Sequence, residues 1–114
     1  MGCGRYEQEA AREAYGKMLE AGATTWWEQL GGYASRCHAW SCAPNIDLSV
    51  YVLGVQPPEP GYAAWRVGPQ PGDLTWAKGV VPTVRGDVDV AWKREGSTFK
   101  LSVTVPMKAV VDLT

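Results

Sequence analysis

Three prolines within four residues divide this chain into two parts. The run QPPEPG occupies residues 56–61, and each proline fixes the backbone φ angle and removes an N–H donor. Neither a helix interior nor a central strand tolerates such a run, so both kinds of element end there. The chain has 114 residues, of which 46% are apolar, and this is enough to pack a core. We therefore expect an α+β protein with helices in residues 1–55 and strands in residues 56–114.

Before the prolines, apolar residues recur with helical spacing. Between residues 6 and 21 they repeat at intervals of three and four, which predicts an amphipathic helix that ends at Gly22. Its apolar side consists of Tyr6, Ala10, Ala14, Met18 and Ala21, widened by Ala11, Tyr15 and Leu19. Residues 43–53 fit two interpretations. Pro44 and Gly54 suit the two ends of a helix, whereas Ile46, Leu48, Val50 and Val52 alternate as in a strand.

After the prolines, the pattern changes to short strands. Residues 87–93 and 98–105 each alternate apolar and polar side chains, and the turn signal Glu95-Gly96 separates them. This arrangement predicts an antiparallel hairpin with one apolar face. Shorter strands are predicted in WRVGP, in LTWAKGVVPTV and in the final AVVDL. Burying these faces favours a small antiparallel β-sandwich of two sheets, with Trp65, Trp76 and Trp92 in its core.

Charge and hydropathy exclude two classes of partner. The formal net charge is −1 and the lysines and arginines are scattered, which argues against nucleic-acid binding. No apolar stretch reaches the roughly 18 residues that a membrane-spanning helix needs. The N-terminal run MGCGRYEQEAAREAYG turns acidic and helical too early for a secretory signal peptide. We therefore expect a cytoplasmic protein that binds neither nucleic acid nor membrane.

Aromatic and polar side chains concentrate in ATTWWEQLGGYASRCHAWS, residues 23–41. This segment holds three of the six tryptophans, the only histidine (His38) and one carboxylate, Glu28. A solvated Glu28, a structural His38 and tryptophans buried in the core are the alternatives to a functional role. The functional interpretation is a ligand site, in which a carboxylate and an imidazole lie beside flat aromatic surfaces. Trp27, next to Glu28, is the tryptophan that we assign to such a site.

The cysteines do not form a recognisable metal motif. Cys3, Cys37 and Cys42 are odd in number, and zinc usually takes four ligands at characteristic pair spacings. We therefore expect three reduced free thiols, no bound metal and no cofactor.

The chain also resembles a known family. In order, the runs TTWWEQ, SRCHAWS, VLGVQPPEPGY, WRVGPQPGDLTWAKGVVPTVRGDVDVAW and FKLSVTVP are similar to the C-terminal part of bacterial α-L-rhamnosidases. These enzymes are inverting glycoside hydrolases, with a catalytic α/α barrel of the six-hairpin type followed by a C-terminal β-sandwich. The resemblance implies that residues 1–55 are the end of the barrel and residues 56–114 the sandwich. It also favours the helical interpretation of residues 43–53.

The resemblance assigns roles to particular residues. The glutamate after T-x-W is the catalytic base in the family, and the histidine of the S-x-x-H motif contacts the rhamnose, which implies these roles for Glu28 and His38. Nine residues separate the two here, where a longer loop is common in the family. The family's general acid and most of its barrel precede the matching segment. The expected function is therefore that of a C-terminal rhamnosidase fragment, which holds the base without the acid and acts on rhamnosides through a parent enzyme or with an upstream barrel polypeptide.

A second hypothesis belongs to a different class of function. A non-catalytic accessory module, with a β-sandwich and an aromatic cluster that recognise carbohydrate, would have the same sequence features. An open reading frame directly upstream that encodes the missing barrel would distinguish the first hypothesis from the second.

Overall fold

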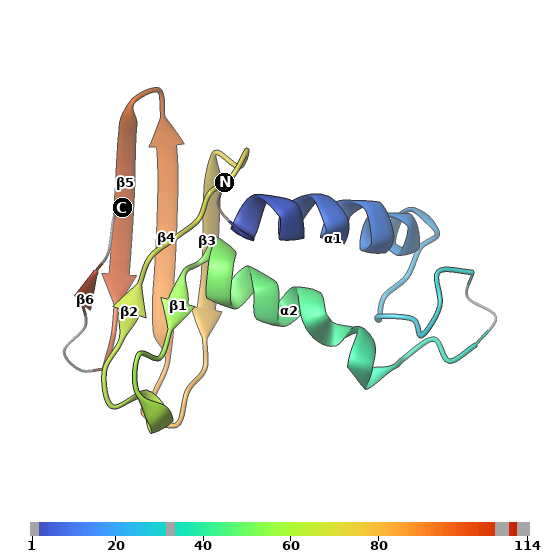
Figure 1. Cartoon of the computed structure of the whole chain (residues 1–114), viewed down its shortest axis with the longest axis horizontal. Helices are drawn as coiled ribbons and strands as arrows, with labels where there is room; N and C mark the ends of the chain where they lie inside the picture. The colour runs from blue at the N-terminus through green and yellow to red at the C-terminus, as the bar shows by residue number, and fades with distance from the viewer. Residues whose placement is uncertain (1–2, 32–33, 107–109, 112–114) are drawn as a thin grey trace.

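Helices precede strands along the chain, and the two kinds of element occupy opposite sides of the molecule (Figure 1). The structure, a computed structural model, describes residues 3–31, 34–106 and 110–111. The mixed helical and β class predicted from the sequence is confirmed, and none of the helices in these residues has the length and apolarity to cross a bilayer. The elements are α1 (Cys3–Glu20), α2 (Ala43–Asp47), β1 (Val55–Gln56), β2 (Arg66–Val67), β3 (Trp76–Val81), β4 (Val88–Glu95), β5 (Thr98–Thr104) and β6 (Val110–Val111).

Helix α1 ends where the sequence predicts. Gly22 adopts a φ of +81°, and the N–H of Ala23 donates to the carbonyl of Met18 at 2.9 Å, a bond that closes the last turn. The buried stripe is narrower than the predicted apolar side, because Met18 is buried whereas Ala10 and Leu19 are exposed. Helix α2 contacts α1 and is far shorter, so it covers only part of the apolar side of α1.

The ambiguous residues 43–53 are helical, and the alternative of a strand is wrong. A 3-10 turn (Ala39–Cys42) leads into α2, which continues as a π-helical segment (Leu48–Val52). Pro44 lies in the first turn of α2, where its missing N–H breaks no helical bond. The alternating pattern does not separate a buried from an exposed face, since Ile46 and Leu48 are both exposed, at 64% and 51%.

Two small sheets follow. Strands β3, β4 and β5 form an antiparallel sheet, and the β4–β5 hairpin predicted around Gly96 is confirmed. Strands β1 and β2 are antiparallel, but β6 pairs with β2 in parallel, so the prediction of purely antiparallel sheets is wrong at this strand. A parallel pair needs a long connection, and β3 to β5 lie between β2 and β6 in the chain. The sandwich and the barrel remnant stay predictions.

The core joins the helical part to both sheets. Trp92 of β4 is 3% exposed, and its indole Nε1 donates to the carbonyl of Val52, at the end of the π-helical segment, at 2.8 Å. Gly79 of β3 leaves room for Leu53, since a Cβ added there would lie 2.7 Å from Leu53 Cδ1. The buried core cluster consists of Val52, Leu53, Val55, Trp65, Val67, Val81, Val88, Val90 and Trp92.

Of the three tryptophans predicted for this core, two are buried. Trp65 is fully buried and Trp92 nearly so, whereas Trp76 is 64% exposed and its prediction is wrong. Trp76 shares the outer face of β3 with Lys78, because successive residues of a strand point to opposite faces.

Side-chain hydrogen bonds connect helix α1 to the segment between β2 and β3. The guanidinium of Arg12 donates to both oxygens of Asp73, at 2.8 and 3.0 Å, and this hydrogen bonding, with the attraction between the charges, raises the pKa of Arg12. Gln8 Nε2 also donates to the carbonyl of Gln70 at 3.1 Å. The helices extend to one side of the sheets (Figure 1). The radius of gyration is accordingly 15.5 Å, above the roughly 13 Å of a compact domain of similar length.

Gly54 should be far more sensitive to substitution than another left-handed glycine. Gly54 has a φ of +78°, and an added Cβ would lie 2.3 Å from the backbone carbon of Gly68. Gly22 has a φ of +81° with no neighbouring atom within 4 Å. We expect Gly22→Ala to lower the free energy of unfolding by about 1 kcal/mol. Gly54→Ala should lower it by about 3 kcal/mol or more.

Urea unfolding of the two variants measures this difference. Equal losses would show that the backbone conformation alone, and not the approach of Gly68, requires glycine at position 54.

Candidate functional site

The segment around Glu28 and His38 lies at the end of the helices that is remote from the sheets (Figure 1). Residues 25–28 and 35–38 run side by side and are joined through their backbones. The N–H of His38 donates to the carbonyl of Trp26 at 2.9 Å, and the N–H of Glu28 donates to the carbonyl of Ser35 at 2.8 Å. The hydroxyl of Thr25 donates to the carbonyl of Arg36. These bonds bring Glu28 and His38 together although nine residues separate them in the chain.

Glu28 and His38 face each other in a partly solvated position. His38 Nδ1 lies 3.6 Å from Glu28 Oε2, and the side chains are 34% and 26% exposed, respectively. The N–H of Ser35 donates to the same carboxylate oxygen at 3.2 Å. Among the described residues, neither contact involves the second oxygen, Oε1. The contacts with Ser35 and His38 therefore orient Glu28 through one carboxylate oxygen, and the side chain remains partly exposed.

Three tryptophans surround this pair in different ways. Trp27 is only 8% exposed, and the guanidinium carbon of Arg36 lies 5.3 Å from the centre of its ring. Trp40 is 71% exposed, and its ring centre lies 4.7 Å from that of His38. The ring of Trp26 meets Tyr15 of α1 edge to face, with 5.2 Å between their centres.

Trp40 is the aromatic residue that the sequence analysis did not assign to the site. Its position two residues after His38 could have predicted a contact between the two side chains, because that contact requires only a local turn. The 3-10 turn Ala39–Cys42 provides that turn, and the N–H of Ser41 donates to the carbonyl of His38 at 3.1 Å.

Within residues 3–31, 34–106 and 110–111, no three histidine, cysteine or acidic side chains gather as metal ligands. Cys37 and Cys42 are free thiols, and the prediction for Cys3 concerns a side chain outside those described. The chemistry available here is that of a carboxylate, an imidazole and indole rings.

Comparison with known proteins identifies the family. Residues 54–114 match the model of the bacterial alpha-L-rhamnosidase C-terminal domain. This chain belongs to that family. The chain is also 34% identical, over 101 residues, to an alpha-L-rhamnosidase of Alteromonas sp. (strain LOR). The structure resembles that of a GH78 family rhamnosidase of Bacillus sp. GL1, with a TM-score of 0.79, 35% identity and 94% of this chain covered.

A third relative shows the same fold at lower identity. The Streptomyces avermitilis alpha-L-rhamnosidase, solved in complex with L-rhamnose, has a TM-score of 0.72 and 23% identity over 85% of this chain. The rhamnosidase family model does not include the candidate site, because Glu28 and His38 precede residue 54. The likeness to the Bacillus structure extends into the helical part, since 94% of the chain exceeds what residues 54–114 contribute.

This chain spans a small part of each relative. It corresponds to 11% of the Alteromonas protein, 13% of the Bacillus chain and 11% of the Streptomyces chain. The rest of each of these rhamnosidases therefore has no counterpart here.

Proposed function

We propose that this chain acts as the C-terminal segment of an α-L-rhamnosidase, in which Glu28 is the general base of an inverting hydrolysis. The observation that carries the proposal is the pairing of Glu28 with His38 across two hydrogen-bonded segments, at the solvated end of the helices. Membership of the rhamnosidase family and the relatives' names support rhamnose-containing glycosides as the substrate class.

The position of Glu28 suits a general base. An inverting glycosidase uses one carboxylate to remove a proton from the water that attacks the sugar carbon. The base must be held in a fixed orientation and must still reach water. The N–H of Ser35 and the imidazole of His38 both lie at Oε2, which supports an arrangement in which Oε1 receives the proton.

His38 and the nearby indoles suit sugar contacts. The imidazole is one-third exposed, so a rhamnose hydroxyl can reach it beside the carboxylate. Trp40 offers an exposed ring next to His38, and an indole packs well against the C–H face of a sugar. Trp27 is proposed as a second sugar contact, which requires Arg36 to move away from its ring, because the side chain is only 8% exposed.

The other half of the chemistry is proposed to come from the rest of a rhamnosidase. An inverting mechanism needs a second carboxyl group, roughly 6.5–9.5 Å from the first, to protonate the leaving oxygen. In this proposal residues 1–55 complete a helical barrel that supplies this acid, and residues 56–114 form the attached β domain. The chain's coverage of 11–13% of its relatives leaves ample sequence for that barrel.

Replacing the base should stop turnover but not binding. In a complete enzyme that contains this segment, Glu28→Gln should lower kcat on an aryl α-L-rhamnoside by about 10²–10⁴-fold, because the amide accepts no proton from water. The KM should change little, since the amide keeps the shape of the carboxylate. Glu20→Gln, at the exposed end of α1, is the matched control and should retain full kcat. A Glu28→Gln enzyme with most of its kcat would refute the assignment.

Removing the imidazole should weaken sugar binding without unfolding the chain. His38→Ala should reduce the affinity of the complete enzyme for L-rhamnose by about 1–2 kcal/mol, the usual effect of losing a polar contact. The melting temperature should stay nearly unchanged, because the bond from His38 to Trp26 uses the backbone N–H. Calorimetric titration and thermal unfolding give the two values. A large fall in melting temperature with unchanged binding would identify a structural histidine instead.

The 114-residue chain alone should not hydrolyse an aryl α-L-rhamnoside at a useful rate. A base gives little acceleration when no acid protonates the leaving oxygen and few walls position the sugar. Adding a separately expressed barrel polypeptide should restore activity if the helical part docks on it. Rhamnoside hydrolysis by the chain alone, abolished by Glu28→Gln, would contradict the proposed division of base and acid.

A further inference from the structure

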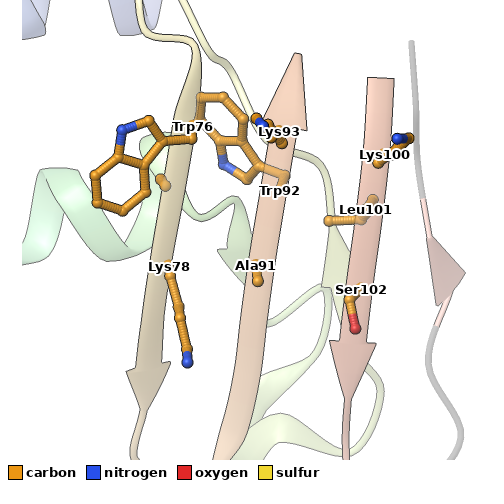
Figure 2. A pocket seen from close by; sticks show the side chains of 9 residues that line it. Trp76, Lys78, Ala91, Trp92, Lys93, Lys100, Leu101 and Ser102 are labelled. Carbon is orange, nitrogen blue, oxygen red and sulfur yellow. The ribbon is translucent and has the colours of Figure 1, made fainter. Parts of the chain in front are cut away.

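The outer face of the β3–β4–β5 sheet carries a groove that the rhamnosidase reaction does not use. It has a volume of about 500 Å³ and lies on the face opposite the core (Figure 2). Sheet strands lie nearly 5 Å apart, so a groove across three of them is roughly 10 Å wide. The outward side chains that line it are Trp76, Lys78, Ala91, Lys93, Lys100 and Ser102.

The strand register places these side chains in two rows. In the first row Trp76 lies opposite Lys93, and Lys93 lies opposite Lys100. In the second row Lys78 lies opposite Ala91, and Ala91 lies opposite Ser102. Figure 2 shows Trp76 and Lys78 on the edge strand, Ala91 on the central strand, and Lys100 and Ser102 on the third strand. The small Ala91 side chain leaves the middle of the groove open between larger neighbours.

Two features of the first row do not serve the fold. Lys93 and Lys100 are direct cross-strand partners, where like charges repel, and the single carboxylate of Glu95 is shared between the two ammonium groups. Trp76 exposes 64% of its surface beside them, although burial would stabilise such a ring by more than almost any other side chain. Unfavourable exposure and like-charge pairing at one place are typical of a binding surface.

The charge of the groove is opposite to that of the whole chain. Three lysines and no acidic residue line it, although the formal net charge of the protein is −1. Glu95, just beyond the groove, lies 2.6 Å from Lys93 Nζ and 3.3 Å from Lys100 Nζ. These contacts with Lys93 and Lys100 lower the pKa of Glu95 and place both ammonium groups beside its carboxylate. Asp89 is on the same face, opposite Thr104 and one row further along.

We propose that this groove binds an acidic glycan, with a sugar ring against Trp76 and its carboxylate groups on Lys78, Lys93 and Lys100. Sugar rings suit this surface, because an indole accepts their C–H face and the hydroxyl of Ser102 can pair with theirs. An acidic peptide suits it less. Extended peptides bind sheets through free backbone groups at an edge, whereas the groove is centred on β4, which is paired on both sides. The groove is independent of the site at Glu28.

Calorimetric titration of the 114-residue chain with trigalacturonate tests the proposal. We expect binding that weakens as sodium chloride rises from 50 to 500 mM, since screening reduces contacts between exposed charges. Methyl-esterified trigalacturonate keeps the rings without the charges and should bind at least tenfold more weakly. Lys78→Met should weaken trigalacturonate binding about tenfold. Trp76→Ala should weaken it at least about fivefold.

Matched variants separate this groove from the rhamnosidase site. Lys17→Met and Trp40→Ala remove an exposed lysine and an exposed indole elsewhere and should leave the affinity unchanged, as should Glu28→Gln. Thermal unfolding checks that each variant is folded. Loss of binding in Trp40→Ala but not in Trp76→Ala would place the ligand at the helical site and overturn the proposal. Equal binding of the methyl ester, or tighter binding of hexaglutamate, would overturn it as well.

Discussion

The hydrogen bond from the indole of Trp92 to the carbonyl of Val52 joins the two parts of this protein. It pairs one of the last carbonyl groups of a helical segment, which no helical N–H reaches, with a donor from the middle of a sheet. Because Trp92 is almost fully buried, both polar groups would lose their hydrogen bonds if either element moved. The position of the helices relative to β3, β4 and β5 therefore depends on this contact, supported by Leu53 packed over Gly79.

The site at Glu28 depends on this arrangement only indirectly. Its geometry comes from bonds between residues 25–28 and 35–38, and from the contact of Trp26 with Tyr15 on α1. Helix α1 is in turn held at Asp73 by Arg12 and at Gln70 by Gln8. Successive local contacts thus connect the sheets to the far end of the helices. The candidate base, Glu28, lies at the far end of the helices, whereas the groove lies on the outer face of the β3–β4–β5 sheet.

Local patterns in the sequence account for the elements that depend on local interactions. The spacing of Met18 and its neighbours gives α1, and the turn at Gly96 gives the β4–β5 hairpin, because both form between residues close in the chain. The parallel pairing of β6 and the π-helical segment depend on distant contacts, so periodicity does not predict them. The core position predicted for Trp76 rests on its place in the β part of the chain, although Lys78 two residues later already marks that face of β3 as exposed.

The candidate site was predictable only in part, because its geometry also depends on contacts between residues that are not adjacent in the chain. Composition singled out the segment, and only the family resemblance selected Glu28 and His38 within it. Their contact requires a chain reversal between the two segments. The Gly31-Gly32 pair in the sequence is a turn signal, but it does not determine which side chains meet. The exposure of Trp40 and the covering of Trp27 by Arg36 follow from that reversal, so residue type alone could not distinguish the two rings.

The π-helical segment Leu48–Val52 allows the chain to hold one additional residue here without reorienting helix α2. A π turn holds about one residue more than an α turn, and each residue of an α-helix rotates about 100° around the axis. Removing one residue from this segment would allow an ordinary α-helix to form without disturbing the Val52 carbonyl that Trp92 binds. Because one residue fewer would then complete the same turn, helix α2 would keep nearly the same face toward α1. Among homologous chains, a deletion of one residue here should therefore leave the side of α1 that packs against α2 unchanged.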